Sequence, residues 1–143
     1  MKVNIINKSN NPLPTYATEG SSGMDLMAYL DSDINLKPLE RKIIPTGLYI
    51  SIPDGYEVQI RPRSGLSIKH GITLVNCVGT IDSDYRGELK LPIINLSNED
   101  YTIRSGDRIA QMILSKYENV EFIEVESLDS TERNDGGFGH SGY

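Results

Sequence analysis

The chain has 143 residues, of which 38% are hydrophobic and 24% are charged, and its formal net charge is −6 at pH 7. This length suits one domain with a real core. The negative charge argues against general binding to nucleic acid backbones, and the apolar runs are too short to span a bilayer. Met1-Lys2-Val3-Asn4 opens directly on a strand-like pattern rather than on a signal peptide, so we expect a cytoplasmic protein.

Cysteine and histidine are scarce. The single cysteine, Cys77, excludes an internal disulfide and a cysteine-based zinc site. The two histidines, His70 and His140, do not lie at metal-ligand spacing, which argues against a transition-metal centre built by the protein. Any anionic ligand must therefore be gathered by local arginines, by backbone N–H groups or by a bound metal ion.

Short alternating apolar runs, separated by Gly, Pro, Asn and Asp, follow one another along most of the chain. They occupy residues 3–7, 24–30, 34–36, 42–44, 48–52, 56–60, 72–75, 88–96, 102–103, 108–114 and 120–125. This pattern predicts an all-β sandwich or barrel. Only residues 64–69 have the composition of a short helix. The 13 glycines and 7 prolines fit the many turns that such a fold needs.

The C-terminal region differs in character. Residues 1–127 form the predicted β-domain, whereas residues 128–143 are polar and small and form a tail. Composition alone favours a disordered terminus. Against this, Phe138 stands among Gly136, Gly137 and Gly139. Glycines allow a backbone to wrap closely around a ligand, and an aromatic ring can cover a flat one.

The central stretch, residues 76–88, carries two acids between glycines. On an extended backbone Asp82 and Asp84 would share one face, and Ser83 and Tyr85 the other. Taken alone, such a run is more often an acidic hairpin turn than a catalytic site. Its meaning depends on the other segments of the chain.

Five segments have to be interpreted together. They are Gly23-Met24-Asp25-Leu26, Pro62-Arg63-Ser64-Gly65-Leu66-Ser67, residues 76–88, Gly106-Asp107-Arg108-Ile109-Ala110-Gln111, and residues 133–142. In this order and at these spacings they resemble the five motifs of the trimeric deoxyuridine triphosphatases (dUTPases), especially the bacterial ones. The resemblance implies a jelly-roll-like fold, a homotrimer, and Mg²⁺-dependent cleavage of dUTP to dUMP and pyrophosphate. It also implies that the tail of one subunit closes over an active site formed by the others.

The resemblance assigns the chemistry to the central stretch. Asp82 matches the catalytic acid that positions and deprotonates the water attacking the α-phosphorus, and Asp84 is left as a structural turn residue. Tyr85 matches the residue that packs beneath the deoxyribose, where a 2′-OH would collide. Asn76 matches a residue that reads the uracil edge. Main-chain groups assist it near Thr80, Ile81 and Lys90.

Phosphate and metal contacts are implied by three other segments. Arg63, Ser64 and Gly65 match the phosphate-binding segment, which in this family faces a site of a neighbouring subunit. An arginine offers a charged fork, and the N–H groups at the start of a short helix point at an anion. Gln111 matches a phosphate and water contact. Asp25 matches a carboxylate that holds Mg²⁺ through water, since Mg²⁺ keeps several waters and is bound largely by phosphates.

The tail also matches the family. Arg133 would clamp the γ-phosphate and Phe138 would stack over uracil, with further phosphate contacts from Gly137, Gly139 and Ser141. The resemblance therefore favours a tail that is mobile when free and ordered by substrate. Asn134 stands where many members have Gly, and asparagine tolerates positive φ. His140 stands where many members have Ser, and a bacterial subset of the family also has His there.

Two other functions remain open at this point. A dCTP deaminase has a related sheet and trimer, but that family typically needs a longer chain and a catalytic Glu after Arg-Ser-Ser, whereas this chain has Arg63-Ser64-Gly65. A non-catalytic, nucleotide-sensing trimer is the second alternative, and Asp82 together with the complete tail argues against it. Gly106, Asp107 and Arg108 are expected to be structural, forming a turn and salt links between subunits.

Overall fold

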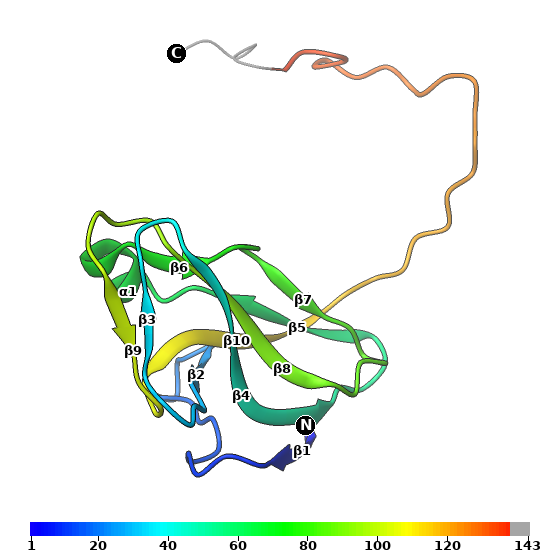
Figure 1. The fold of residues 1–143 in the computed structure, drawn as a ribbon. Helices are drawn as coiled ribbons and strands as arrows, with labels where there is room; N and C mark the ends of the chain where they lie inside the picture. The colour runs from blue at the N-terminus through cyan, green and yellow to red at the C-terminus, as the bar shows by residue number, and fades with distance from the viewer. Residues whose placement is uncertain (138–143) are drawn as a thin grey trace.

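The computed structural model describes residues 1–137, and these contain ten strands and one short helix (Figure 1). No helix in this part of the chain is long and apolar enough to cross a membrane. The elements are β1 (Asn4–Asn7), β2 (Met24–Met27), β3 (Ile34–Leu36), β4 (Arg41–Ser51), β5 (Tyr56–Arg61), α1 (Ser64–His70), β6 (Ile72–Leu74), β7 (Gly79–Ile81), β8 (Glu88–Asn95), β9 (Tyr101–Ile103) and β10 (Arg108–Lys116). The predicted fold class, all-β with one short helix, is confirmed.

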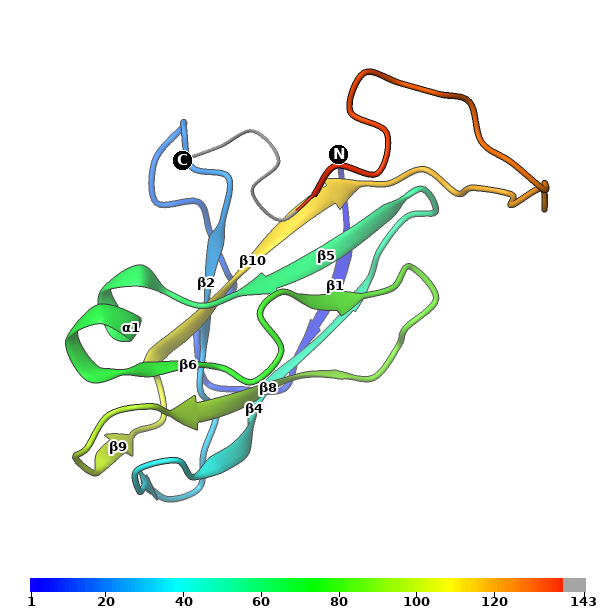
Figure 2. The same ribbon diagram turned by 90° about the horizontal axis from the view of Figure 1, so that it is seen from above.

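The strands form two four-stranded antiparallel sheets and one small pair. One sheet has the order β1-β4-β8-β6 and the other β2-β10-β5-β7, while β3 pairs with β9. Side chains from both large sheets join in a single apolar core, so the sheets make a sandwich around it (Figure 2). Strands that are neighbours in a sheet are distant in the sequence. Because β10 lies between β2 and β5, its register with these two strands decides which motifs lie side by side.

Alternation along the strands builds this core. In β8, Leu89, Leu91 and Ile93 are fully buried, while Lys90 between them is exposed. This is the period of two that places successive side chains on opposite faces of a sheet. The buried polar side chain of Thr46 donates its hydroxyl to the carbonyl of Leu89 at 2.7 Å, so its burial leaves no unpaired group.

The loop at residues 82–87 connects the two sheets. It follows β7, which lies at the edge of one sheet beside β5, and it leads into β8, which lies between β4 and β6 in the other. At the start of β8 the Glu88 carboxylate accepts the Gly47 N–H at 2.9 Å, where the register of β4 shifts. The loop is thus anchored in both sheets.

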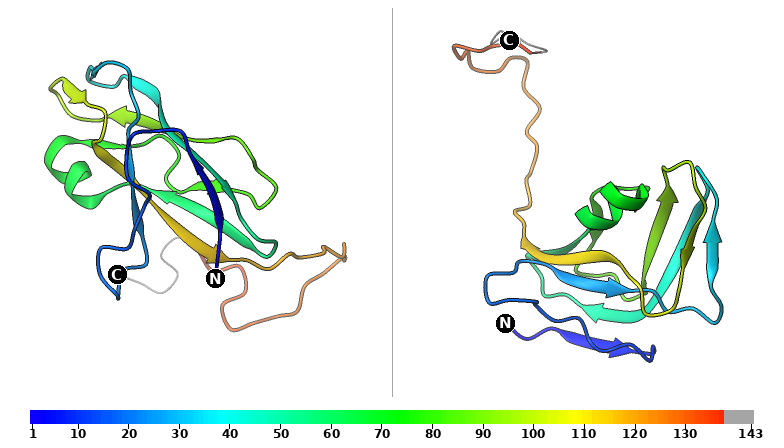
Figure 3. Two further views of the ribbon diagram at one scale, coloured as in Figure 1. Left: turned by 90° about the horizontal axis from the view of Figure 1, so that it is seen from below. Right: turned by 90° about the vertical axis from the view of Figure 1, so that its left-hand side faces the viewer.

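One predicted strand is absent. β10 ends at Lys116, and residues 120–125 have neither a sheet partner nor any other regular structure. After β10 the chain runs away from the sheets (Figures 1 and 3). Phe122 and Ile123 are 91% and 81% exposed. The alternation there is real, but a strand also needs a neighbouring edge to pair with, and the segment meets none among residues 1–137.

Candidate active site

Three strands and the helix bring the predicted phosphate-binding residues together. In β10, Gln111 lies opposite Asp25 of β2 on one side and opposite Arg61 of β5 on the other. Two residues, Pro62 and Arg63, separate the end of β5 from the start of helix α1. The result is an open hollow of about 460 Å³, and it is lined by Asp25, Arg63, Ser64, Gly65, Leu66, Lys69, His70 and Gln111.

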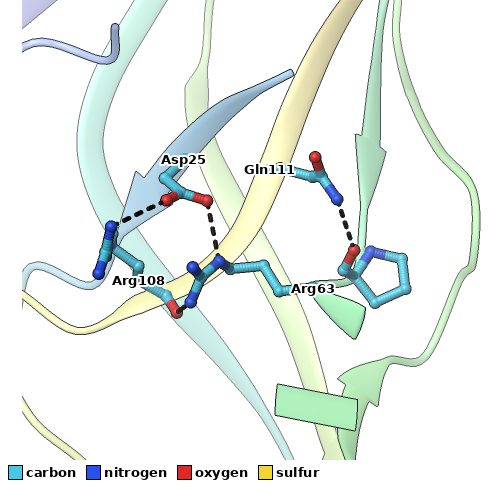
Figure 4. A network of polar contacts seen from close by, with 5 residues as sticks. Asp25, Arg63, Arg108 and Gln111 are labelled. Carbon is cyan, nitrogen blue, oxygen red and sulfur yellow. Dashed lines mark hydrogen bonds and ion pairs between the residues drawn. The ribbon is translucent and has the colours of Figure 1, made fainter. Parts of the chain in front are cut away.

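A carboxylate and a carbonyl hold the Arg63 side chain (Figure 4). Its Nε lies 2.8 Å from Oδ1 of Asp25, and its Nη1 donates to the carbonyl of Arg108 at 3.0 Å. The Arg108 side chain approaches the other Asp25 oxygen at 3.4 Å. A guanidinium carries five N–H donors, so three of those on Arg63 have no partner within residues 1–137. They can serve an anion in the hollow.

Gln111 supports the same segment. Its Nε2 donates to the carbonyl of Pro62 at 3.0 Å, directly before Arg63 (Figure 4). A Cβ on Gly23 would lie 2.5 Å from the Gln111 side-chain oxygen. Glycine at position 23 therefore leaves the space that Gln111 occupies, which explains one residue of the first motif by contact rather than by backbone conformation.

The donor set near Asp25 fits only a loosely held metal ion. Among residues 1–137, no three His, Cys, Asp or Glu side chains gather into a metal-holding group. Asp25 lines the hollow, but both of its oxygens face arginines. Mg²⁺ bound largely by substrate phosphates and water needs few protein ligands. The described residues are therefore compatible with Mg²⁺ that arrives with a triphosphate, and they provide no cage for the free ion.

The loop at 82–87 holds its own shape. The Tyr85 N–H donates to the Asp82 carbonyl at 3.2 Å, and the Tyr85 hydroxyl donates to the Glu88 carbonyl at 3.0 Å. Nη1 of Arg86 donates to the Ser83 carbonyl at 2.6 Å. The carboxylates of Asp82 and its rival Asp84 are both exposed, with no partner in the described part of the chain. Their surroundings in one chain do not distinguish them.

The residues assigned to uracil recognition lie beside this loop. Thr80 and Ile81 belong to β7, where they pair with Gln59 and Val58 of β5. Asn76 precedes β7, and its Nδ2 lies 3.3 Å from the place of a Cβ on Gly79. Lys90 lies further along, in β8. Asn76, Thr80 and Ile81 therefore lie directly before the loop that carries Asp82 and Tyr85, and Lys90 lies after it.

In the tail, the structure describes two of the predicted site residues, Arg133 and Gly137. Nε of Arg133 donates to the Gly136 carbonyl at 2.7 Å, which closes a turn. Asn134 has φ of +44° in this turn, the conformation that its side chain was predicted to tolerate. Gly137 is exposed. Phe138, Gly139 and Ser141, with their predicted contacts, lie outside the described residues, and so does His140.

The dUTPase family model matches residues 9–142. The chain belongs to the dUTPase family. It is 79% identical over its whole length to a deoxyuridine 5′-triphosphate nucleotidohydrolase of Finegoldia magna, with all of both chains covered. It is 58% identical to the enzyme of that name from Fusobacterium nucleatum, over 99% of this chain and 97% of the relative.

Solved structures agree with the family assignment. The dUTPase of Staphylococcus bacteriophage 80alpha, a G164S mutant with dUpNHpp, matches with a TM-score of 0.88 and 26% identity over 99% of each chain. A phage phi11 dUTPase mutant, described with a structural Mg(II) ion, matches with a TM-score of 0.81 over 91% of this chain at 24% identity, which speaks for the fold alone. The expected jelly-roll-like dUTPase fold is confirmed.

The dUTPase residues fall into two groups that a single chain keeps apart. The hollow collects Asp25, Arg63, Ser64, Gly65 and Gln111. None of the residues predicted on the central stretch contributes to its lining. Asp82, the predicted catalytic acid, and Arg63, the predicted phosphate-binding arginine, are therefore not joined in one cavity of the isolated chain.

Sequence reasoning missed three residues of the hollow and one contact. Leu66, near the start of α1, is one of the three. Lys69 and His70, in the last turn of α1, line the hollow beside Arg63. The length of the helix could have predicted Lys69 and His70 as lining residues. Seven residues make only two turns, so both ends of the helix lie near one site. The His70 ring lies 5.1 Å from that of Tyr101, whose pKa is raised by partial burial. The missed contact is that of Arg108, which pairs with Asp25 of its own chain. The salt link between subunits expected of Arg108 stays a prediction.

Proposed function

We propose that this protein hydrolyses dUTP to dUMP and pyrophosphate, through a water that Asp82 activates for attack on the α-phosphorus. The family match over residues 9–142 is the observation that carries the proposal. Such an enzyme limits uracil in DNA and supplies dUMP for dTMP synthesis, and we assign it to the cytoplasm. The hollow supports an anionic substrate, because cationic side chains gather there in a chain whose net charge is −6.

In the proposed mechanism, Arg63 binds the phosphates. Its guanidinium is held at two points by Asp25 and the Arg108 carbonyl, so it need not be ordered when substrate arrives. The Ser64 hydroxyl and the Gly65 backbone line the same hollow. A Cβ on Gly65 would meet nothing within 4 Å, which leaves room for a ligand against the chain. Gln111 holds the Pro62 carbonyl and so supports this segment.

Asp82 performs the proton transfer in this proposal. Its carboxylate accepts a proton from the attacking water. The water attacks the α-phosphorus in line with the bond to the leaving pyrophosphate. Tyr85 packs beneath the deoxyribose, and Asn76 with the backbone near Thr80 and Ile81 binds uracil. When bound with the triphosphate, Mg²⁺ supplies charge neutralisation and orientation of the phosphates, and Asp25 would hold it through water.

The active enzyme is proposed to be a homotrimer with shared sites. Two observations support this. The catalytic loop and the phosphate hollow are separate within one chain. Beyond β10, a run of apolar side chains is exposed, which is typical of surfaces that bind another subunit: Val120, Phe122, Ile123, Val125 and Leu128. In this assembly residues 1–127 form the β-domain, and residues 128–143 of one subunit close over a site of the others.

The function is tested by measuring pyrophosphate release from dUTP, with and without Mg²⁺, for the wild-type protein and two matched variants. Asp82→Asn removes the proton acceptor, so we expect a loss on the order of 10² to 10⁴ in rate. Asp84→Asn makes the same change two residues away and should leave the rate near wild type. The reverse pattern would move the catalytic role to Asp84. Ammonia release from dCTP, assayed in parallel, would indicate a deaminase, because uracil itself carries no amino group to lose. Binding of dUTP without turnover would indicate a sensor.

The shared site is tested by reassembly. Asp82→Asn with an intact tail, and a chain truncated after Glu132 with Asp82 intact, are each expected to be inactive. If the acid and the tail of one site come from different chains, random mixing of unfolded chains gives about a quarter of the sites both intact parts. Activity should then exceed that of either parent. No recovery, with mixed trimers confirmed by native mass spectrometry, would exclude the shared architecture.

A further inference from the structure

The Tyr85 side chain lies directly against the backbone of Gly87. An ideal Cβ on Gly87 would overlap the Tyr85 hydroxyl oxygen and ring, with Cε2 2.9 Å away. Gly87 is not among the glycines with positive φ, which are Gly47, Gly55, Gly71 and Gly106. The backbone conformation therefore does not require glycine here. The contact with Tyr85 does.

Both ends of Tyr85 are tied to the loop that carries Asp82. The Tyr85 backbone N–H donates to the Asp82 carbonyl, and its hydroxyl donates to the Glu88 carbonyl immediately after Gly87. The hydroxyl can reach that carbonyl only by crossing residue 87. The side chain is still 42% exposed. One side of Tyr85 thus rests on bare backbone while the rest is available to a ligand.

We propose that Gly87 is a specificity-determining positioning residue that sets the height of Tyr85 under the sugar. The inference rests on the proposed function, in which Tyr85 packs beneath the deoxyribose of dUTP. Carbon atoms closer than about 3.5 Å repel, so a methyl group at position 87 must displace the ring and break the hydroxyl bond to Glu88. A displaced ring no longer presents a fixed surface where the 2′-OH of a ribonucleotide would collide.

The measurement is kcat/KM for dUTP and for UTP in wild type, Gly87→Ala and Gly20→Ala. Gly20 is the matched control, because its added Cβ meets nothing within 4 Å and its φ is not positive. We expect Gly87→Ala to lower the dUTP/UTP ratio, which is kcat/KM for dUTP divided by kcat/KM for UTP, by about 10-fold or more. This is the scale of a misplaced methyl-sized contact. Gly20→Ala should keep the wild-type ratio.

A second background separates positioning from a general structural effect. If Gly87 acts only through Tyr85, then Gly87→Ala should not change the dUTP/UTP ratio further in a Tyr85→Ala protein. An equal fall of the ratio in both backgrounds would place its effect elsewhere. If Gly87→Ala does not fold, Tyr85→Phe tests the same arrangement, because it keeps the ring and removes the bond to Glu88. Its ratio should also fall.

The outcomes for this inference and for the proposed function are distinct. A wild-type protein that hydrolyses UTP as well as dUTP would overturn the role of Tyr85 itself. A wild-type protein that discriminates strongly, together with a folded Gly87→Ala variant of unchanged ratio, would overturn the role of Gly87 alone. Thermal melting and native mass spectrometry of each variant establish that folded oligomers are being compared.

Discussion

The ion pair between Asp25 and Arg63 should contribute measurably to stability, unlike the exposed pairs of this protein. Its Nε–Oδ1 distance is 2.8 Å, and the two side chains are only 32% and 31% exposed. Hydrogen bonds to charged groups contribute about 1.5–3 kcal/mol when buried, and exposed pairs about 0–1 kcal/mol. At this intermediate exposure we expect a coupling of about 1–1.5 kcal/mol. The longer Arg108 contact adds little, because that side chain is 58% exposed.

The coupling can be isolated with a double-mutant cycle of Asp25→Ala and Arg63→Ala. The free energy of unfolding is measured in urea at one fixed protein concentration, since the stability of an oligomer depends on concentration. Lys116 and Glu118 form a matched control pair, 3.7 Å apart and 68% and 85% exposed. Its coupling should be about 0–0.3 kcal/mol. An Asp25–Arg63 coupling no larger than this control would refute the reasoning.

The same pair should affect substrate binding. If Asp25 holds Arg63 ready for phosphates, releasing the arginine makes substrate binding bear the cost of ordering it. A coupling of about 1–1.5 kcal/mol corresponds to a rise in the KM for dUTP of roughly 5- to 13-fold in Asp25→Ala. A KM that stays at the wild-type value would show that Arg63 keeps its position without Asp25.

Truncation after Glu132 should leave the fold intact by circular dichroism while kcat falls strongly, because the predicted lid is lost but no core residue is removed. Leu91→Ala should lower the free energy of unfolding by about 2–5 kcal/mol in urea titrations, because Leu91 is fully buried in β8. The pKa of the Glu40 carboxyl should lie below its ordinary value by carboxyl NMR, because its carboxylate accepts the Lys37 N–H. The stabilisation from Glu40 is therefore present above the ordinary pKa and is lost as the pH falls through the lowered one.

Strands with their own apolar alternation could be predicted from the sequence, and strands defined by a partner could not. β8 shows the inward and outward pattern in its sequence and in its burial. β7 is only Gly-Thr-Ile, residues 79–81, and it exists because the edge of β5 accepts it. The reverse holds for residues 120–125, which alternate but find no edge. Local pattern decides the faces of a strand, while tertiary pairing decides whether the strand forms.

The site could be predicted as a set of residues but not as a set of contacts. The motifs named Asp25, Arg63 and Gln111, yet no local rule places an acid of β2 against an arginine beyond β5. The register of β10 does so, because its residue 111 faces both neighbouring strands. The pairing of Asp25 with Arg63 and Arg108 also shows that a carboxylate assigned to a metal has a second partner in this chain. Sequence spacing carries no sign of this.

The separation of Asp82 from Arg63 within one chain keeps these two groups from pairing with each other. A carboxylate beside a guanidinium forms an ion pair, and the N–H donors then occupy its oxygens. Asp25 already occupies that position against Arg63. Asp82 instead lies on a loop and has no ion-pair partner in residues 1–137, so its oxygens remain available to a water. On the shared-site proposal, Asp82 of one subunit lies near Arg63 of a neighbouring subunit in the assembled enzyme. The bound triphosphate then separates the two side chains. A dissociated chain would then contain an unpaired Asp82 and a positioned Arg63. It would still be inactive, because the two residues would not belong to the same site.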